Sequence, residues 1–296
     1  MTRPAAPVSA VEVRSFPGAP AAIVVDSPHS GFGFPEDFAP AAPLNALRST
    51  WDAHVEALWG GAPGAGATLL AATFPRCYID VNRAEGDLDA ALLADAWDGP
   101  LAPTDYSRRG MGLIRRDALP GVPMYGAPLW AAAVRMRIDR WYRPYREALA
   151  GAIAKGQRVH GAVWHLNCHS MKSRGNAMNV DAGATRPDVV VSDRRGTTAD
   201  PALTARIAAW FSARGYRTQV NEPYQGGDLV RTFGAPTVGV QSVQIEFNRS
   251  RYMDEATCEP HEGFAALRDD CTALVAAMVV WRDEWSAERR DAAVRA

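Results

Sequence analysis

His29 stands where a histidine can hold a metal ion or transfer a proton. It lies in the small-residue turn DSPHSG (residues 26–31), directly after the apolar, β-branched run 21–25. A histidine on a short turn at the end of a strand is well placed to project into a cleft. A turn histidine that bonds to nearby backbone is an equally good interpretation of this segment.

His169 follows a second strand-like segment, residues 161–168. Because side chains alternate along a strand, we expect His165 and His169 to share a face, with Asn167 between them on the same side. His169 is the better candidate ligand, since it lies nearer the carboxyl edge of the strand. The other histidine of the pair then packs in the core.

A zinc ion in a catalytic site commonly takes three protein ligands, histidine and carboxylate, and keeps an open position for water. Two strand-end histidines fit this requirement. The spacings H-x-x-E and H-E-x-x-H are absent, so spacing alone does not identify the third ligand. The remaining histidines have the pattern of surface or helix-start residues: His54, His160 and His261.

The segment DVNR (residues 80–83) offers an amide and a guanidinium at adjacent positions where a strand-like run ends. The guanidinium of Arg83 is the side chain best suited to bind a carboxylate through two hydrogen bonds, and Asn82 can help to orient it. An ion pair of Arg83 with Asp80 or Glu85 is the structural alternative.

Glu246 lies within an otherwise apolar strand-like segment, QIEFNR (residues 244–249). A buried carboxylate without a partner is costly, so its pKa is expected to rise, and a raised pKa suits a general base. A salt bridge to Arg249 or Arg251 is the alternative.

Strand-like and helix-like segments alternate along the chain, and no repeat is present, which predicts an α/β fold. The expected strands are 21–25, 67–74, 161–168, 188–191 and 237–247, and the expected helices are 52–59, 129–154, 201–213 and 261–285. Pro144 should kink or divide the second helix. Residues 86–128 should form long loops over the site.

We expect an arm over residues 1–20 and a single domain over residues 21–296. This domain should contain a mixed sheet flanked by helices. Ligands should bind at the carboxyl ends of its strands.

Composition excludes several classes of function. The chain has 296 residues, is 47% hydrophobic and carries a formal net charge of −1, so neither nucleic acid nor an anionic membrane is an expected partner. Its four cysteines form no C-x-x-C pair, which argues against a disulfide framework or a structural zinc knuckle. The first 20 residues contain no long apolar run, so we expect neither a signal peptide nor a membrane span, and a cytoplasmic location.

Taken together, six segments resemble those of the N-formylglutamate amidohydrolase (deformylase) family, whose fold is similar to that of zinc carboxypeptidases and aspartoacylases. The segments are SPHSG (27–31), WDAHVEAL (51–58), DVNR (80–83), CHSM (168–171), NEPYQGG (221–227) and QIEFNR (244–249). They occur in family order, and the ordered set carries the resemblance more than any one motif. The segments GMGLI (110–114) and SDRRG (192–196) resemble further family loops.

The resemblance implies that His29, His169 and an acidic residue bind zinc. We place the third ligand on Asp52, at the head of a predicted helix. The chain departs here from the H-x-x-E of carboxypeptidases, since Phe32 stands three residues after His29. Glu246 falls where the related hydrolases keep the general base.

The resemblance also implies the residues that bind substrate and stabilise charge. Asn82 and Arg83 match a substrate-binding pair, and Arg83 or Arg76 is expected to stabilise the developing oxyanion. Arg194 or Arg195 is the predicted second carboxylate ligand. The Gly226-Gly227 turn lets backbone approach the ligand closely, although a plain turn explains these glycines almost as well.

The implied activity is zinc-dependent hydrolysis of N-formyl-L-glutamate, a small anionic substrate, in histidine degradation, by a monomer or homodimer. The alternatives are a metal-dependent amidase, deacylase or carboxypeptidase-like enzyme acting on another N-acyl amino acid, or a metal-free small-molecule binding protein.

Overall fold

The central element of the computed structural model, which describes residues 5–15, 18 and 21–295, is a seven-stranded sheet of order β1-β3-β2-β6-β9-β7-β8. Its strands are β1 (Val11–Ser15), β2 (Ile23–Ser27), β3 (Ala67–Ala72), β6 (Val163–Met171), β7 (Val189–Ser192), β8 (Thr218–Val220) and β9 (Val240–Asn248). The four strands β3, β2, β6 and β9 are parallel, whereas β1 and β7 pair antiparallel with β3 and β9. The sheet is therefore mixed, as predicted.

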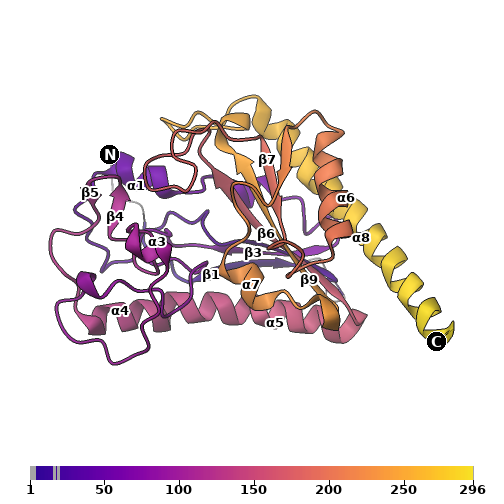
Figure 1. The fold of residues 1–296 in the computed structure, drawn as a ribbon, viewed down its shortest axis with the longest axis horizontal. Helices are drawn as coiled ribbons and strands as arrows, with labels where there is room; N and C mark the ends of the chain where they lie inside the picture. The colour runs from indigo at the N-terminus through magenta and orange to yellow at the C-terminus, as the bar shows by residue number, and fades with distance from the viewer. Residues whose placement is uncertain (1–4, 16–17, 19–20, 296) are drawn as a thin grey trace.

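Helices cover both faces of the sheet (Figure 1). One face packs against α4 (Ala131–Arg137) and α5 (Arg143–His160), and the other against α2 (Val55–Leu58), α6 (Pro201–Ser212) and α8 (Gly263–Arg295). Successive residues of β2 enter the two cores in turn, Val24 on the α5 side and Ile23 and Val25 on the α8 side. This alternation explains why the strand is apolar throughout, because both of its faces are buried.

The predicted helix 129–154 is one continuous helical segment over residues 131–160, with an irregularity directly before Pro144. A π-helical segment, Ile138–Tyr142, separates α4 from α5, and Pro144 lies in the first turn of α5. Proline has no backbone N–H and its ring crowds the preceding turn, so the π-helical segment lies where the sequence predicts a disturbance, although the helix is not divided in two.

Short elements connect the main layers. Between β3 and α4 lie a 3₁₀ turn (Ala90–Leu92), α3 (Asp105–Arg108) and the two-stranded pair β4 (Asp117–Leu119) and β5 (Val122–Pro123). The remaining elements are α1 (Leu44–Thr50), α7 (Asp228–Phe233) and 3₁₀ turns at Pro236–Val238 and Arg249–Arg251. Residues 86–128 thus form mostly loops, as expected.

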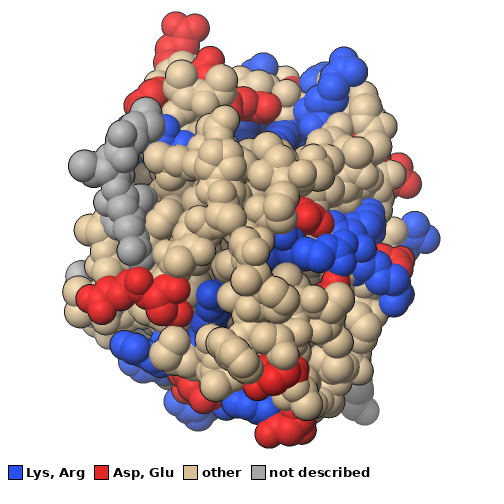
Figure 2. All heavy atoms as spheres, turned by 90° about the vertical axis from the view of Figure 1, so that its left-hand side faces the viewer, with Lys and Arg blue, Asp and Glu red and all other residues tan. Residues whose placement is uncertain are grey.

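Part of the predicted N-terminal arm belongs to the sheet, because Val11–Ser15 forms β1 and pairs with β3. Residues 1–4, 16–17 and 19–20 of that arm lie outside the described residues. Within the part of the chain that is described, no helix combines the length and apolar character needed to cross a bilayer. Acidic and basic side chains lie interspersed on the face shown in Figure 2, in keeping with the small net charge.

Asp26 holds a buried polar network beneath the carboxyl edge of the sheet. Its carboxylate accepts hydrogen bonds from His165 Nε2 (2.8 Å), Asn167 Nδ2 (2.8 Å) and the Tyr145 hydroxyl (2.7 Å). Burial raises the pKa of Asp26, but the hydrogen bond and charge of His165, followed by the other two bonds, lower it below its ordinary value. His165 and Asn167 therefore share a face, as their alternation predicts, and Asp26 fixes the orientation of both.

We expect Asp26→Asn to lower the free energy of unfolding at pH 7 by about 3–5 kcal/mol, because an amide cannot accept three hydrogen bonds at this buried position. Tyr145→Phe is the control and removes only one donor, at a cost of about 1–3 kcal/mol. Urea unfolding measures both effects.

The pH dependence follows from the lowered pKa of Asp26 in the folded protein. Its contribution is fully present above the unfolded pKa, about 3.9, and is lost as the pH falls through the lower folded pKa. The difference between wild type and Asp26→Asn should therefore shrink below about pH 4. An equal stability of the two proteins at pH 7 would contradict the role of Asp26.

Candidate metal and catalytic site

Strand register brings the candidate residues to one edge of the sheet. β6 and β9 are parallel, and His169 lies opposite Glu246 in their register. His29 follows the end of β2, which neighbours β6 on its other side. Asp52 precedes α2, and its backbone N–H donates to the His29 carbonyl at 3.2 Å. Segments separated by more than two hundred positions thus meet at the carboxyl ends of three parallel strands.

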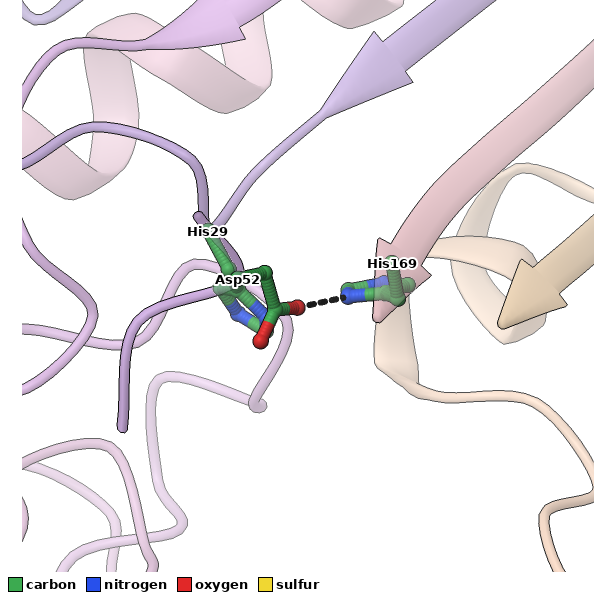
Figure 3. A group of neighbouring side chains, drawn as sticks. All are labelled: His29, Asp52 and His169. Carbon is green, nitrogen blue, oxygen red and sulfur yellow. Dashed lines mark hydrogen bonds and ion pairs between the residues drawn. The ribbon is translucent and has the colours of Figure 1, made fainter. Parts of the chain in front are cut away.

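His29, Asp52 and His169 form a compact buried cluster. One potential ligand atom from each lies within 4.8 Å of the others, and the centroids of the two imidazole rings are 4.6 Å apart. Figure 3 shows the Asp52 carboxylate between the two rings. Asp52 Oδ2 lies 3.1 Å from His169 Nδ1 and 3.4 Å from His29 Nδ1. The predicted convergence of the two histidines is confirmed, and their role as ligands stays a prediction.

The outer nitrogen of each imidazole meets a hydrogen-bond acceptor. His29 Nε2 donates to Asp80 Oδ1 at 2.7 Å, and His169 Nε2 donates to Asn167 Oδ1 at 2.8 Å. The Asn167 oxygen faces His169 because its nitrogen donates to Asp26. From these acceptors we assign the proton of each imidazole to Nε2, which directs both Nδ1 lone pairs toward Asp52.

This arrangement fits a bound cation. Two Nδ1 lone pairs and a carboxylate oxygen converge, and they repel one another unless a metal ion or additional protons lie between them. His29 Nδ1 is buried and has no hydrogen-bond partner among the described residues. Catalytic zinc sites commonly use two histidine nitrogens and one carboxylate oxygen as ligands. Their histidines are usually oriented by hydrogen-bond acceptors on the outer ring nitrogens, as they are here.

The charges of Asp52 and Asp80 are maintained despite complete burial. Burial raises the pKa of Asp52, but in the metal-free site hydrogen bonds from the protonated rings of His169 and His29, and then the charge of Arg76, hold it well below its ordinary value. Burial likewise raises the pKa of Asp80, but the charge of Arg76 and then that of His29 hold it well below its ordinary value. Arg249 Nη2 donates to Asp52 Oδ1 at 2.9 Å, so one carboxylate oxygen is fixed and the other faces the imidazoles.

Local chain conformation allows the close approach of these segments. A side chain on Gly31 would overlap the backbone of residues 72–74, so the turn after His29 requires glycine. A side chain on Gly227 would overlap the Asn82 amide. Gly226 has a φ of +107°, which also favours glycine.

Glu246 lies beside the cluster, is 9% exposed and accepts a hydrogen bond from Gln244 at 3.0 Å. It has no salt bridge within the described chain, since Arg249 pairs with Asp52 instead. Burial, and then the charge of Asp52, raise the pKa of Glu246 against the opposing charge of His169. A carboxyl group with a raised pKa in a cavity is suited to accept and return a proton.

The cavity at this edge has two adjoining compartments. The catalytic compartment is lined by His29, His169, Glu246, Asn82 and Arg83. The side compartment is lined by Asp52, Ser170, Lys172, Asn176 and Arg249. Residues that line both include Arg76, Met111, Arg115, Asn179 and Tyr224.

The candidate substrate residues line the catalytic compartment. Asn82 Oδ1 accepts from the Leu229 N–H at 2.8 Å, so its Nδ2 faces the site, 3.1 Å from His169 Nε2. Arg83 donates to the carbonyls of Met111 and Asn82, both at 3.0 Å, and stacks on Tyr106 at 3.9 Å.

The other predicted residues have different surroundings. Arg76 binds Asp80 through Nε and Nη2, and its Nη1 lies 3.7 Å from Asp52 Oδ1. Arg194 donates to the Gly226 carbonyl at 2.9 Å and lines a neighbouring cavity shared with Asn82 and Arg83.

Sequence reasoning missed several residues that orient the site. Asp80 and Arg249 lie within the quoted motifs, but only structural ion pairs were considered for them. Gln244 links the Gly227 N–H to Glu246, and strand alternation with Glu246 is the signal that places both on one face.

The fold and the site together define an α/β protein with a buried candidate metal centre of the hydrolytic type. The chain matches the model of the N-formylglutamate amidohydrolase family over residues 21–253. It is similar to an N-formylglutamate amidohydrolase structure from Ralstonia eutropha, with 40% identity, a TM-score of 0.89 and coverage of 94% of this chain and 99% of that one.

Curated relatives agree with this match. N-formylglutamate deformylase of Pseudomonas aeruginosa is 28% identical over 94% of this chain and 98% of the relative, and that of Pseudomonas putida is 25% identical with the same coverage. The chain belongs to the N-formylglutamate amidohydrolase family, and it is therefore a hydrolase of amide bonds.

Metal content tests the histidine cluster. We expect His29→Gln and His169→Gln to lose a divalent ion that wild type holds at about one per chain, because a catalytic site depends on each of its three protein ligands. His54→Gln is the control, since His54 bonds to the Cys258 carbonyl outside the cluster. Elemental analysis gives the readout, and full metal content in His169→Gln would contradict the assignment.

Proposed function

We propose that this chain hydrolyses N-formyl-L-glutamate to formate and L-glutamate with the help of one zinc ion held by His29, Asp52 and His169. The convergence of two Nδ1 lone pairs and a carboxylate oxygen beside the buried Glu246 carries the proposal. The names of the relatives support the substrate.

The atoms that would hold the ion are both Nδ1 atoms and Asp52 Oδ2, with Asp80 and Asn167 orienting the rings. Zinc bound there would supply Lewis acidity, which polarises a carbonyl and lowers the pKa of water to about 7. The protein contributes the geometry and a surrounding shielded from solvent.

Glu246 acts as the general base and then as the general acid. Its carboxylate takes a proton from the attacking water and delivers that proton to the departing amine of glutamate. Burial favours this exchange, because it raises the pKa of Glu246 toward the range in which the group both accepts and releases a proton. Gln244 holds one carboxylate oxygen, so the other remains free to face the substrate.

Asn82 and Arg83 bind and orient a carboxylate of the substrate. Arg83 has both Nε and Nη1 bonded to backbone carbonyls, which fixes its guanidinium before substrate arrives. Arg76 and Arg83 place positive charge where the formyl oxygen becomes negative in the transition state. The Gly226-Gly227 turn lines the same compartment and leaves room for the ligand. We further propose a cytoplasmic enzyme of histidine degradation.

An assay of L-glutamate release, the product common to all three substrates below, tests the activity. N-formyl-L-glutamate should be hydrolysed faster than N-acetyl-L-glutamate and N-succinyl-L-glutamate, and a chelator should abolish turnover until zinc is restored. The larger acyl groups serve as matched controls, because they keep the glutamate portion. Equal rates for all three acyl groups, or turnover unaffected by the chelator, would contradict the proposal.

Glu246→Gln should lower kcat by roughly 10²–10⁴, the usual contribution of general acid–base catalysis, while the metal content stays at the wild-type level. The control is Glu85→Gln, since Glu85 is an exposed partner of Arg143. Steady-state kinetics with elemental analysis of the same samples measure both quantities. A Glu246→Gln enzyme that turns over like wild type would remove Glu246 from the mechanism.

A further inference from the structure

Arg115 is a buried cation for which the proposed mechanism has no use. Its side chain is 6% exposed and lines both compartments of the cavity. Its Nε is buried without a hydrogen-bond partner, and in the described part of the chain its guanidinium makes no ion pair. A guanidinium normally forms up to five hydrogen bonds, so this environment leaves most of its capacity unused.

The other cations around the cavity divide into two groups. Arg76, Arg186 and Arg249 are neutralised by Asp80, Asp181 and Asp52 respectively. By contrast, Arg83, Arg115 and Lys172 have no carboxylate partner among the residues that the structure describes. Three positive charges in one cavity therefore remain uncompensated by the protein.

Burying an unpaired charge costs several kcal/mol, and a fold retains it where a ligand supplies the counter-charge. Burial, and next the nearby charge of Arg76, lower the pKa of Arg115 to about 9. The guanidinium is therefore still protonated at neutral pH. Burial and the charge of Arg249 similarly lower the pKa of the partly buried Lys172 to about 8.

The backbone around Arg115 is fixed before any ligand binds. Arg115 pairs with Met111 in an isolated antiparallel bridge. Between them, the Leu113 N–H donates to the Asp87 carbonyl at 2.7 Å, and the Leu113 carbonyl accepts from the Asp80 N–H at 2.9 Å. The loop that carries Arg115 is thus tied to the segment that orients His29, so the backbone from which the Arg115 side chain enters the cavity is fixed relative to the site.

We propose that Arg115, assisted by Lys172, binds the side-chain carboxylate of the N-acyl dicarboxylic amino acid and so selects glutamate over neutral amino acids. This inference rests on the proposed function. The substrate carries two carboxylates, and Arg83 with Asn82 accounts for one of them.

The geometry distinguishes the two carboxylates. The Asn82 amide lies 3.1 Å from the His169 ring, so the Asn82–Arg83 pair binds close to the reacting centre. The α-carboxylate is the one nearer the scissile amide. Lys172 lines only the side compartment, which neither imidazole nor Glu246 lines, and Arg115 joins the two compartments. The side-chain carboxylate, two methylene groups farther from the amide, reaches that region.

The test compares N-formyl-L-glutamate with N-formyl-L-glutamine, which differ only in the charge of the side-chain group. Wild type should prefer the acid by about a hundredfold in kcat/KM, because the amide leaves a buried cation without a counter-charge. Arg115→Met should reduce the preference to less than about tenfold, mainly through a higher KM for the acid. Arg115→Lys should keep more of the preference than Arg115→Met, since lysine keeps the positive charge but cannot bind a carboxylate through two parallel hydrogen bonds.

Arg116→Gln is the matched control, because Arg116 is the next residue and pairs with Asp89 and Asp117. It should keep the wild-type preference. The Tm of Arg115→Met without substrate should equal or exceed that of wild type, since the variant removes an unpaired buried charge. A structural role for Arg115 predicts a lower Tm instead.

The outcomes separate this inference from the proposed function. Wild type that does not hydrolyse N-formyl-L-glutamate overturns the proposed function and this inference with it. An active wild type whose preference is unchanged in Arg115→Met overturns the inference alone. The inference is also overturned if Arg115→Met keeps its preference for the side-chain acid but no longer prefers N-formyl-L-glutamate over its α-amide. Arg115 would then bind the α-carboxylate.

Discussion

The site depends on the repulsion among three electron-rich atoms buried at one point. His29 Nδ1, His169 Nδ1 and Asp52 Oδ2 face one another because Asp80 and Asn167 accept the protons of the outer ring nitrogens. A divalent ion bound by these three atoms would replace this repulsion with attraction. The polar network around Asp26 and the backbone contact between residues 29 and 52 hold the donors in place. The fold therefore provides a preorganised site, which is what metal-assisted hydrolysis requires.

Charge balance links the metal centre to substrate selection. The carboxylates nearest the centre, Asp52 and Asp80, are matched by Arg249 and Arg76. We infer that a metal ion and an anionic substrate would supply the charges that the protein leaves open: the ion beside the imidazoles, and carboxylates beside Arg83 and Arg115. Each buried charge without an ion-pair partner lowers the stability of the protein without ligand. Its burial becomes favourable only when a ligand of opposite charge binds beside it. Affinity for a doubly charged substrate follows from that arrangement.

Local patterns in the sequence predicted much of the fold and the meeting of His29 and His169 at one edge of the sheet. The apolar runs before His29 and His169 marked two central strands, and alternation placed His165 and Asn167 on one face. The pairing of β1 with β3 could not be predicted, because Val11–Ser15 is short, largely solvent-facing and gives no strong periodic signal. The partners of Arg249 and Arg115 depend on contacts between distant segments, and spacing along the chain does not encode those contacts.

Anomalous diffraction at the zinc edge, from crystals grown with zinc, tests whether His29, Asp52 and His169 bind a metal ion. We expect one strong peak at about 2.0–2.2 Å from Nδ1 of His29, Nδ1 of His169 and a carboxylate oxygen of Asp52. A peak elsewhere in the cavity, or coordination through Nε2 of either histidine, would contradict it, because the hydrogen bonds to Asp80 and Asn167 would then have to break.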